Sequence, residues 1–197
     1  MDRNTLSNFR VRMHYDKSRE LTNNLLFMHA VTVEDSDKNF VFNPDVANSL
    51  KWPSNVKTMH DYRMMYSGVY DRLYQICVIS LCSDIEFFFK DIFDEYGYTK
   101  GSGNGFFQRF DDVIASLSDK IDFSGITTSL ETLRLAFQIR HICIHNMGFV
   151  DENFNSKTNL GTVGSSFNVS QSEFRCFFDA YEILLKHLDK NLPAPQV

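Results

Sequence analysis

The residues best suited to chemistry lie close together in one short apolar segment. Residues 130–147 read LETLRLAFQIRHICIHNM, in which Arg140, His141 and His145 interrupt a run of apolar side chains. An imidazole titrates near neutral pH and can act as a general acid or base. An arginine guanidinium can bind a phosphate or a carboxylate through two hydrogen bonds at once. The segment therefore contains the residue types needed for acid–base chemistry beside a bound anion.

A helix over this segment would gather most of its polar side chains on one edge. At about 100° per residue, one narrow stripe contains Glu131, Arg134, Gln138, His141 and His145. Nearly all the remaining positions are apolar, so the helix is expected to be buried elsewhere. Burying the polar edge without partners would cost several kcal/mol. The pattern predicts that this edge faces a cleft, water or another subunit.

Arg140 lies off this stripe, between apolar neighbours on the helical wheel. A buried arginine requires a carboxylate or a phosphate as its partner. Asp84 and Glu86, in a second strongly apolar segment, are the candidate carboxylates. Two interpretations are therefore open: an internal ion pair between two core helices, or a site that binds phosphate.

A metal site is the weaker alternative for the two histidines. His141 and His145 are four residues apart, as metal-binding pairs on a helix are, but Ile142 follows His141 and no acidic partner is evident. The cysteines form no CxxC pair; they are Cys77, Cys82, Cys143 and Cys176. We expect no metal, no cofactor, and reduced, buried thiols.

The composition favours a helical protein. Only 9 Gly and 4 Pro occur in 197 residues, and 43% of the residues are hydrophobic, which suits long helices and a proper core. We predict an all-α fold, a bundle of four to five helices in one domain over residues 1–197. Residues 1–55 would form an N-terminal helix and a connection, and residues 56–192 the helical core with the motif.

Start and stop signals place the individual helices. A helix is expected over residues 6–31, another over 56–98 with a break near Gly68, and a shorter one over 105–117. Capping-box spacings at 128–131 and 170–173 predict the starts of the last two helices, which would end near Met147 and before Pro193. Gly148 suits a left-handed C-cap. A short strand is expected at 39–42, and a long loop or small hairpin at 149–169.

The charge narrows the classes of partner. A net charge of −5 argues against binding nucleic acid through overall charge, so affinity would have to come from a local basic pocket around Arg134 and Arg140. No signal segment or membrane-length apolar stretch is present in the sequence. We therefore expect a cytoplasmic protein with no membrane contact. The 19 Phe are expected in the core, with some at a subunit interface.

Residues 140–145 fit the pattern of Arg, a polar residue, three residues and His, which resembles the signature of the HEPN superfamily. These small all-helical domains occur in prokaryotic toxin–antitoxin and antiviral systems. The context is similar too: an apolar helix with acidic residues precedes the motif, and Gly148 and a loop follow it. The similarity covers about residues 56–188. It departs at His141, where Asn or Asp is more usual, and at Met147, where one branch has a modified Tyr.

The resemblance implies a metal-independent endoribonuclease that cleaves RNA by 2′-hydroxyl attack. It implies a homodimer with a composite active site, a toxin or anti-phage role, and an antitoxin or regulatory partner. His145 would be the acid or base and Arg140 the phosphate clamp; His141 and Asn146 would support them, and Arg134 would add charge to the pocket. The alternative is a non-catalytic HEPN-like dimerisation or RNA-binding module.

Overall fold

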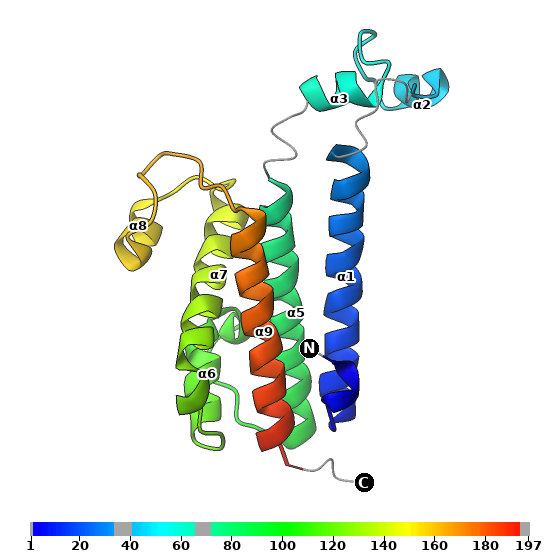
Figure 1. Ribbon diagram of the computed structural model, residues 1–197. Coiled ribbons are helices and arrows are strands. Elements are labelled where there is room, and N and C mark those ends of the chain that lie inside the picture. The colour runs from blue at the N-terminus through cyan, green and yellow to red at the C-terminus, as the bar shows by residue number, and fades with distance from the viewer. Residues whose placement is uncertain (1, 34–40, 66–71, 194–197) are drawn as a thin grey trace.

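The computed structural model describes residues 2–33, 41–65 and 72–193, and this part of the chain is helical without a β-strand. Its long helices run side by side (Figure 1): α1 (Phe9–Val33), α5 (Leu73–Tyr96), α7 (Thr127–His145) and α9 (Gln171–Asn191). The shorter helices are α2 (Pro44–Ser49), α3 (Met59–Met65), α6 (Phe110–Ser118) and α8 (Glu152–Thr158). The prediction of an all-α fold is confirmed, but the predicted number of four to five helices is too low, because the described residues form eight α-helices.

Helix α5 is the centre of the core. It packs against α1, α7 and α9. Side chains such as Leu81, Ile85, Phe88 and Phe89 are at most 1% exposed. Burying each such side chain contributes about 1.5–3 kcal/mol, so α5 holds the other long helices in place. The strongly apolar segment that contains Asp84 and Glu86 is thus the centre of the core, although its Phe87 is 49% exposed.

The described chain before α5 contains one helix, α2, that was not expected. The helix predicted over 56–98 consists of α3 and α5, and residues 66–71, with Gly68, lie outside the described part. Helix α2 forms within the predicted connection because the Asn43 side chain accepts a hydrogen bond from the Asp45 N–H and Pro44 begins the helix. The strand predicted at 39–42 lies partly outside the described residues; Val41 makes one isolated antiparallel bridge with Thr58.

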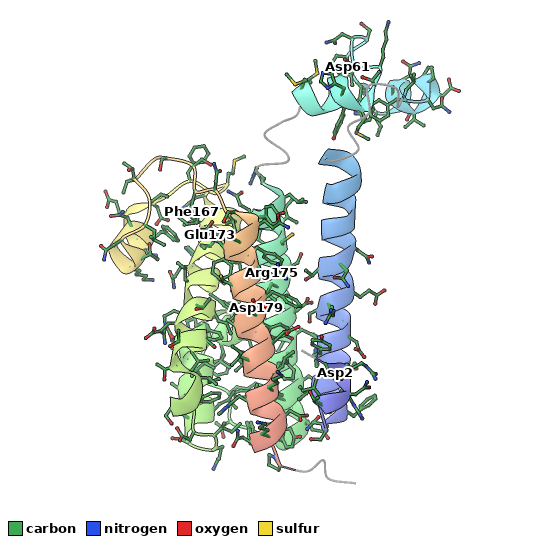
Figure 2. All side chains as sticks on the ribbon, in the orientation of Figure 1. Asp2, Asp61, Phe167, Glu173, Arg175 and Asp179 are labelled. Atoms are coloured by element: carbon green, nitrogen blue, oxygen red, sulfur yellow. The ribbon has the colours of Figure 1, made fainter. Side chains whose placement is uncertain are left out.

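The two predicted capping boxes have opposite outcomes. At α9 the box is present: the Ser170 hydroxyl accepts from the Glu173 N–H at 3.2 Å, and the Ser170 N–H donates to the Glu173 carboxylate at 2.7 Å. Figure 2 shows Glu173 near the start of this helix. At α7 the prediction is wrong, because a 3₁₀ turn over Ser124–Ile126 leads directly into a helix that begins at Thr127 without a side-chain cap.

The segment before α9 is more ordered than the predicted long loop or small hairpin. It contains α8, whose first turn is capped by Asp151 accepting from the Phe154 N–H at 2.7 Å. One antiparallel bridge joins Phe149 to Ser166 in place of a hairpin. The capping carboxylate explains why helix forms in so polar a segment.

The cysteines are buried as expected, with one exception. Cys77, Cys82 and Cys143 are buried, and burial raises the pKa of the Cys77 and Cys143 thiols to about 11. These thiols therefore stay protonated near neutral pH. Cys176 is exposed on α9, so the prediction is wrong for this residue. None of the described helices is both long and apolar enough to cross a membrane.

Candidate functional site

Helix α7 presents a polar edge to solvent, as its sequence predicts. Glu131, Arg134, His141 and His145 are exposed and Gln138 is half-buried. The opposite side is buried against the core through Leu133, Ala136, Ile139 and Ile142. The rings of His141 and His145 lie beside each other, with centroids 4.7 Å apart. Helical spacing thus places two imidazoles together at the end of an anchored helix.

This edge forms one wall of a cavity of about 440 Å³ among α6, α7 and α8. The cavity collects five of the residues singled out from the sequence: Arg134, Gln138, Arg140, His141 and His145. Phe137 of the same helix also lines it, and other parts of the chain complete the lining with Gly105, Gln108, Arg109, Phe110, Asp111, Asp112, Asn153 and Lys157. Two imidazoles and several basic side chains therefore share one opening.

Arg140 connects this cavity with the core. Its Nη2 lies 2.7 Å from Oε1 of Glu86 on α5, and the two side chains are 15% and 8% exposed. Of the two candidate carboxylates, Glu86 is therefore the partner. Burial raises the pKa of Glu86, and the nearby Arg140 charge offsets this only in part. The Nε of Arg140 is buried and has no hydrogen-bond partner in the described part of the chain.

Asp84, the other candidate, has a separate environment. Burial raises the pKa of its carboxyl, and the positive charge that lowers it comes from Lys17 of α1. The two acidic residues differ by two positions on α5, so a helix directs them to different sides. Asp84 therefore faces the α1 side, away from the cavity residues.

The sequence patterns did not identify two basic residues of the cavity as site residues. Arg109 precedes α6, pairs with Asp112 and donates to the Ser102 carbonyl at 2.8 Å. Lys157 belongs to α8, and none of the described carboxylates forms an ion pair with it. Neither residue lies in a motif. Both reach the cavity only because α6 and α8 pack against α7, so no spacing of residues along the sequence could have revealed them.

Carboxylates also reach the cavity and balance part of its charge. Nε of Arg134 lies 2.6 Å from Oδ1 of Asp111, and both side chains are about half exposed. Arg109 is paired with Asp112 in the same way. The arginines are thus oriented by neighbours, whereas Lys157 and the two histidines contribute hydrogen-bond donors that no carboxylate of the described ranges occupies.

Asn146 takes a position beside the cavity rather than in its lining. Its Nδ2 donates to Asp151, the residue that caps α8. The pKa of Asp151 is lowered, first by the Phe154 N–H and also by this amide. Asn146 therefore ties the end of α7 to the start of α8, which carries Lys157.

Gly148 fixes how the chain leaves α7. Its φ is +85°, and its N–H donates to the Ile142 carbonyl at 3.0 Å. A Cβ at this position would lie 2.7 Å from Nε2 of Gln75, which donates to the carbonyl of Phe167 at 2.6 Å. Figure 2 shows Phe167 near the N-terminal end of α9. The prediction that Gly148 has a positive φ is confirmed, but Met147, with φ +54°, takes the left-handed position directly after the C-cap Asn146. Gly148 follows it, and its close approach to Gln75 brings α5, the end of α7 and the segment before α9 together.

The arrangement suits proton transfer next to an anion. Within the described ranges, no group of three or more His, Cys, Asp or Glu side chains is arranged to hold a metal ion. No family model matches this chain, and no curated protein and no solved structure matches it either. The chemistry of the cavity therefore has to be argued from its own residues.

Proposed function

We propose that this chain is a metal-independent endoribonuclease of the HEPN type, acting in the cytoplasm as a toxin or anti-phage defence effector. One observation carries the proposal: Arg140 and His145, the two ends of the motif, line the same cavity. His141, Arg134 and Lys157 line it as well. An anionic backbone entering the cavity would meet these donors at once.

The chemistry requires one proton acceptor, one proton donor and a group that stabilises negative charge. His145 takes the proton from the RNA 2′-hydroxyl or protonates the leaving 5′-oxygen, and the His145 of a second copy or solvent water carries out the other of these two proton transfers. The 2′-oxygen–phosphorus bond forms as the phosphorus–5′-oxygen bond breaks, leaving a 2′,3′-cyclic phosphate and a 5′-hydroxyl. The guanidinium of Arg140 stabilises the charge that develops on the phosphoryl oxygens. His141, beside His145, orients the imidazole or the substrate.

Glu86 supports this assignment by orienting Arg140. A guanidinium has five N–H donors, and the ion pair with Glu86 uses Nη2. Its Nε is buried, so the donors left for a phosphate at the cavity are the remaining ones on the two terminal nitrogens. A fixed guanidinium loses little conformational freedom when it binds, so the buried carboxylate is a positioning group.

A homodimer is part of the proposal. Four exposed apolar side chains lie near the point where Gly148 approaches Gln75. Ile76 belongs to the start of α5 and Ile144 to the end of α7, and the segment after α7 contributes Met147 and Phe149. Burying them against a second copy would be favourable. It would also bring a second Arg140 and His145 to the site. An antitoxin or regulatory partner would then restrain the free enzyme.

A non-catalytic HEPN-like module for dimerisation or RNA binding is the second candidate. The ion pair between Arg140 and Glu86 favours it, because such a pair also suits a purely structural arginine. The pairing of Arg134 with Asp111 points the same way, since it neutralises charge in the cavity.

The two candidates are separated by incubating the purified chain with RNA in excess EDTA. His145→Ala is the test variant, and His60→Ala, on α3, is the matched control. Cleavage by the wild type and by His60→Ala, but not by His145→Ala, supports the nuclease. A requirement for divalent metal, or equal cleavage by all three, overturns the mechanism. RNA binding without cleavage in any variant identifies the module.

A further inference from the structure

A second cavity adjoins the first along α7. It has a volume of about 500 Å³ and shares four lining residues with the first cavity: Asp111, Arg134, Gln138 and Lys157. Glu131, Leu135, Thr158 and Leu160 complete its lining. The shared wall makes the two cavities neighbouring parts of one groove. A chain-like ligand bound in the first cavity would therefore continue into the second.

The second cavity differs from the first in its chemistry. It contains no histidine, and two aliphatic side chains line it: Leu135 is half-buried and Leu160 is 38% exposed. Arg134 is oriented at the shared wall by Asp111. A flat base can stack on an arginine plane and on apolar side chains. The volume falls in the range of small-molecule sites, about 300–1,000 Å³.

One carboxylate of this cavity is available for recognition. Asp111 is occupied by Arg134, whereas no side chain of the described ranges forms an ion pair with Glu131. A carboxylate only accepts hydrogen bonds. At the C4 position of a pyrimidine it pairs with cytosine, whose N4 amino group donates, and is repelled by uracil, whose O4 carbonyl only accepts. The N3–H of uracil is also a donor, but it lies between two carbonyl oxygens that repel an approaching carboxylate.

We propose that the second cavity binds the nucleobase next to the scissile phosphate, and that Glu131 selects amino-bearing bases over uracil there. This inference rests on the proposed ribonuclease function. The base would stack on Arg134 and against Leu160, while its amino group donates to Glu131. Gln138 and Lys157 at the shared wall would hold the connecting backbone. Glu131 is in this sense a specificity-determining residue.

The test measures binding in a His145→Ala background, so that cleavage does not interfere. Two single-stranded oligonucleotides, oligocytidylate and oligouridylate of equal length, are titrated by fluorescence anisotropy. Oligocytidylate is expected to bind about tenfold more tightly, since one good base contact discriminates at about this level. Adding Glu131→Gln should bring the ratio near one, because an amide also donates to uracil. Glu20→Gln, an exposed position on α1, is the matched control and should keep the ratio.

A second variant tests the stacking surface. Leu160→Asn should weaken both oligonucleotides about equally, by roughly five- to tenfold. The exposed Leu50→Asn should have no effect. Equal affinities for the two oligonucleotides in the His145→Ala chain, or a preference that survives Glu131→Gln, overturn the inference while the ribonuclease proposal stands. If wild type neither binds nor cuts RNA, both proposals fail together.

Discussion

Arg140 of α7 is paired with Glu86 of α5 at 2.7 Å between Nη2 and Oε1, and the same arginine lines the cavity that contains His145. One side chain thus takes part in core packing and faces a solvent-accessible site. Removing the Arg140 side chain would therefore disturb both the stability of the fold and the cavity. The effect on stability can be recognised by its dependence on pH, because it varies with the protonation of Glu86.

Arg140→Ala should lose stability in a pH-dependent way. Burial already raises the pKa of Glu86 above 4.5, and loss of Arg140 raises it further. A carboxyl whose folded pKa exceeds its unfolded pKa favours folding below the unfolded value, and that contribution is lost as pH rises through the folded pKa. The variant should nearly match wild type at about pH 4 and be about 1–3 kcal/mol less stable near pH 8. Urea unfolding at both pH values measures this.

Arg134→Ala is the control for that comparison. Its pair with Asp111 is about half exposed on both sides, so its loss should cost little at either pH. An equal loss of stability by Arg140→Ala at acidic and alkaline pH would show that the arginine acts through packing alone.

Arg140→Lys should reduce RNA cleavage much more than it reduces stability. Lysine keeps the positive charge beside Glu86 but loses the planar fork that binds two phosphoryl oxygens. Losing one such donor costs about 100-fold in rate. Single-turnover cleavage and urea unfolding, measured on the same preparation, test this. Wild-type cleavage by Arg140→Lys would assign the arginine to the core and not to the reaction.

Ser170→Ala should destabilise the chain by about 1 kcal/mol, since the Ser170 hydroxyl caps α9. Thr128→Ala should have almost no effect, although the same sequence pattern surrounds it. Helix α7 begins at Thr127, so Thr128 is already inside the helix and caps nothing. Thermal unfolding of the two variants compares them directly. A loss at Thr128 as large as the loss at Ser170 would contradict the helix start described here.

The contrast between these caps shows how far the sequence predicts the fold. Local patterns identify the long helices and the polar edge of α7, because the 3.6-residue period and the low glycine and proline content act within one segment. They do not determine which of two similar S/T-x-x-E patterns becomes a cap. That outcome depends on the preceding chain: at α7 a 3₁₀ turn leads into the helix, whereas at α9 the approach is extended.

The candidate site likewise contains residues that the sequence predicts and residues that only tertiary packing brings to it. Arg140, His141 and His145 are recognisable because they share one motif on one helix. Arg109 and Lys157 reach the cavity only through the packing of α6 and α8, which no spacing encodes. The choice of Glu86 over Asp84 follows from the direction in which α5 presents each side chain. Both acidic residues lie in the same apolar segment, so the sequence alone could not show which of them pairs with Arg140.

Gly148→Ala should destabilise the chain by about 2–4 kcal/mol. The residue would keep an unfavourable positive φ and its Cβ would lie 2.7 Å from Nε2 of Gln75, a buried side chain bonded to the Phe167 carbonyl. Gly164→Ala isolates the backbone part of this cost. Gly164 has a φ of +83°, and a Cβ there would meet nothing within 4 Å, so only about 1 kcal/mol is expected. If urea unfolding gave equal losses of stability for the two variants, the Gln75 side chain would have moved away from the new Cβ at little cost.

His14→Phe should flatten the dependence of stability on pH below about pH 6.5. His14 is 2% exposed, packs on Phe88 with ring centroids 4.8 Å apart, and has Nε2 3.1 Å from Oδ2 of Asp91. Burial lowers its pKa below 6.5 and outweighs the attraction of Asp91. A lowered histidine pKa means that the unfolded chain binds more protons, so the stability present above pH 6.5 falls as pH decreases. Urea unfolding at several pH values tests this, with His60→Phe as the control that should retain the slope. If the free energy of unfolding of His14→Phe fell with decreasing pH as steeply as that of the wild type, other groups would be responsible for the loss of stability in acid.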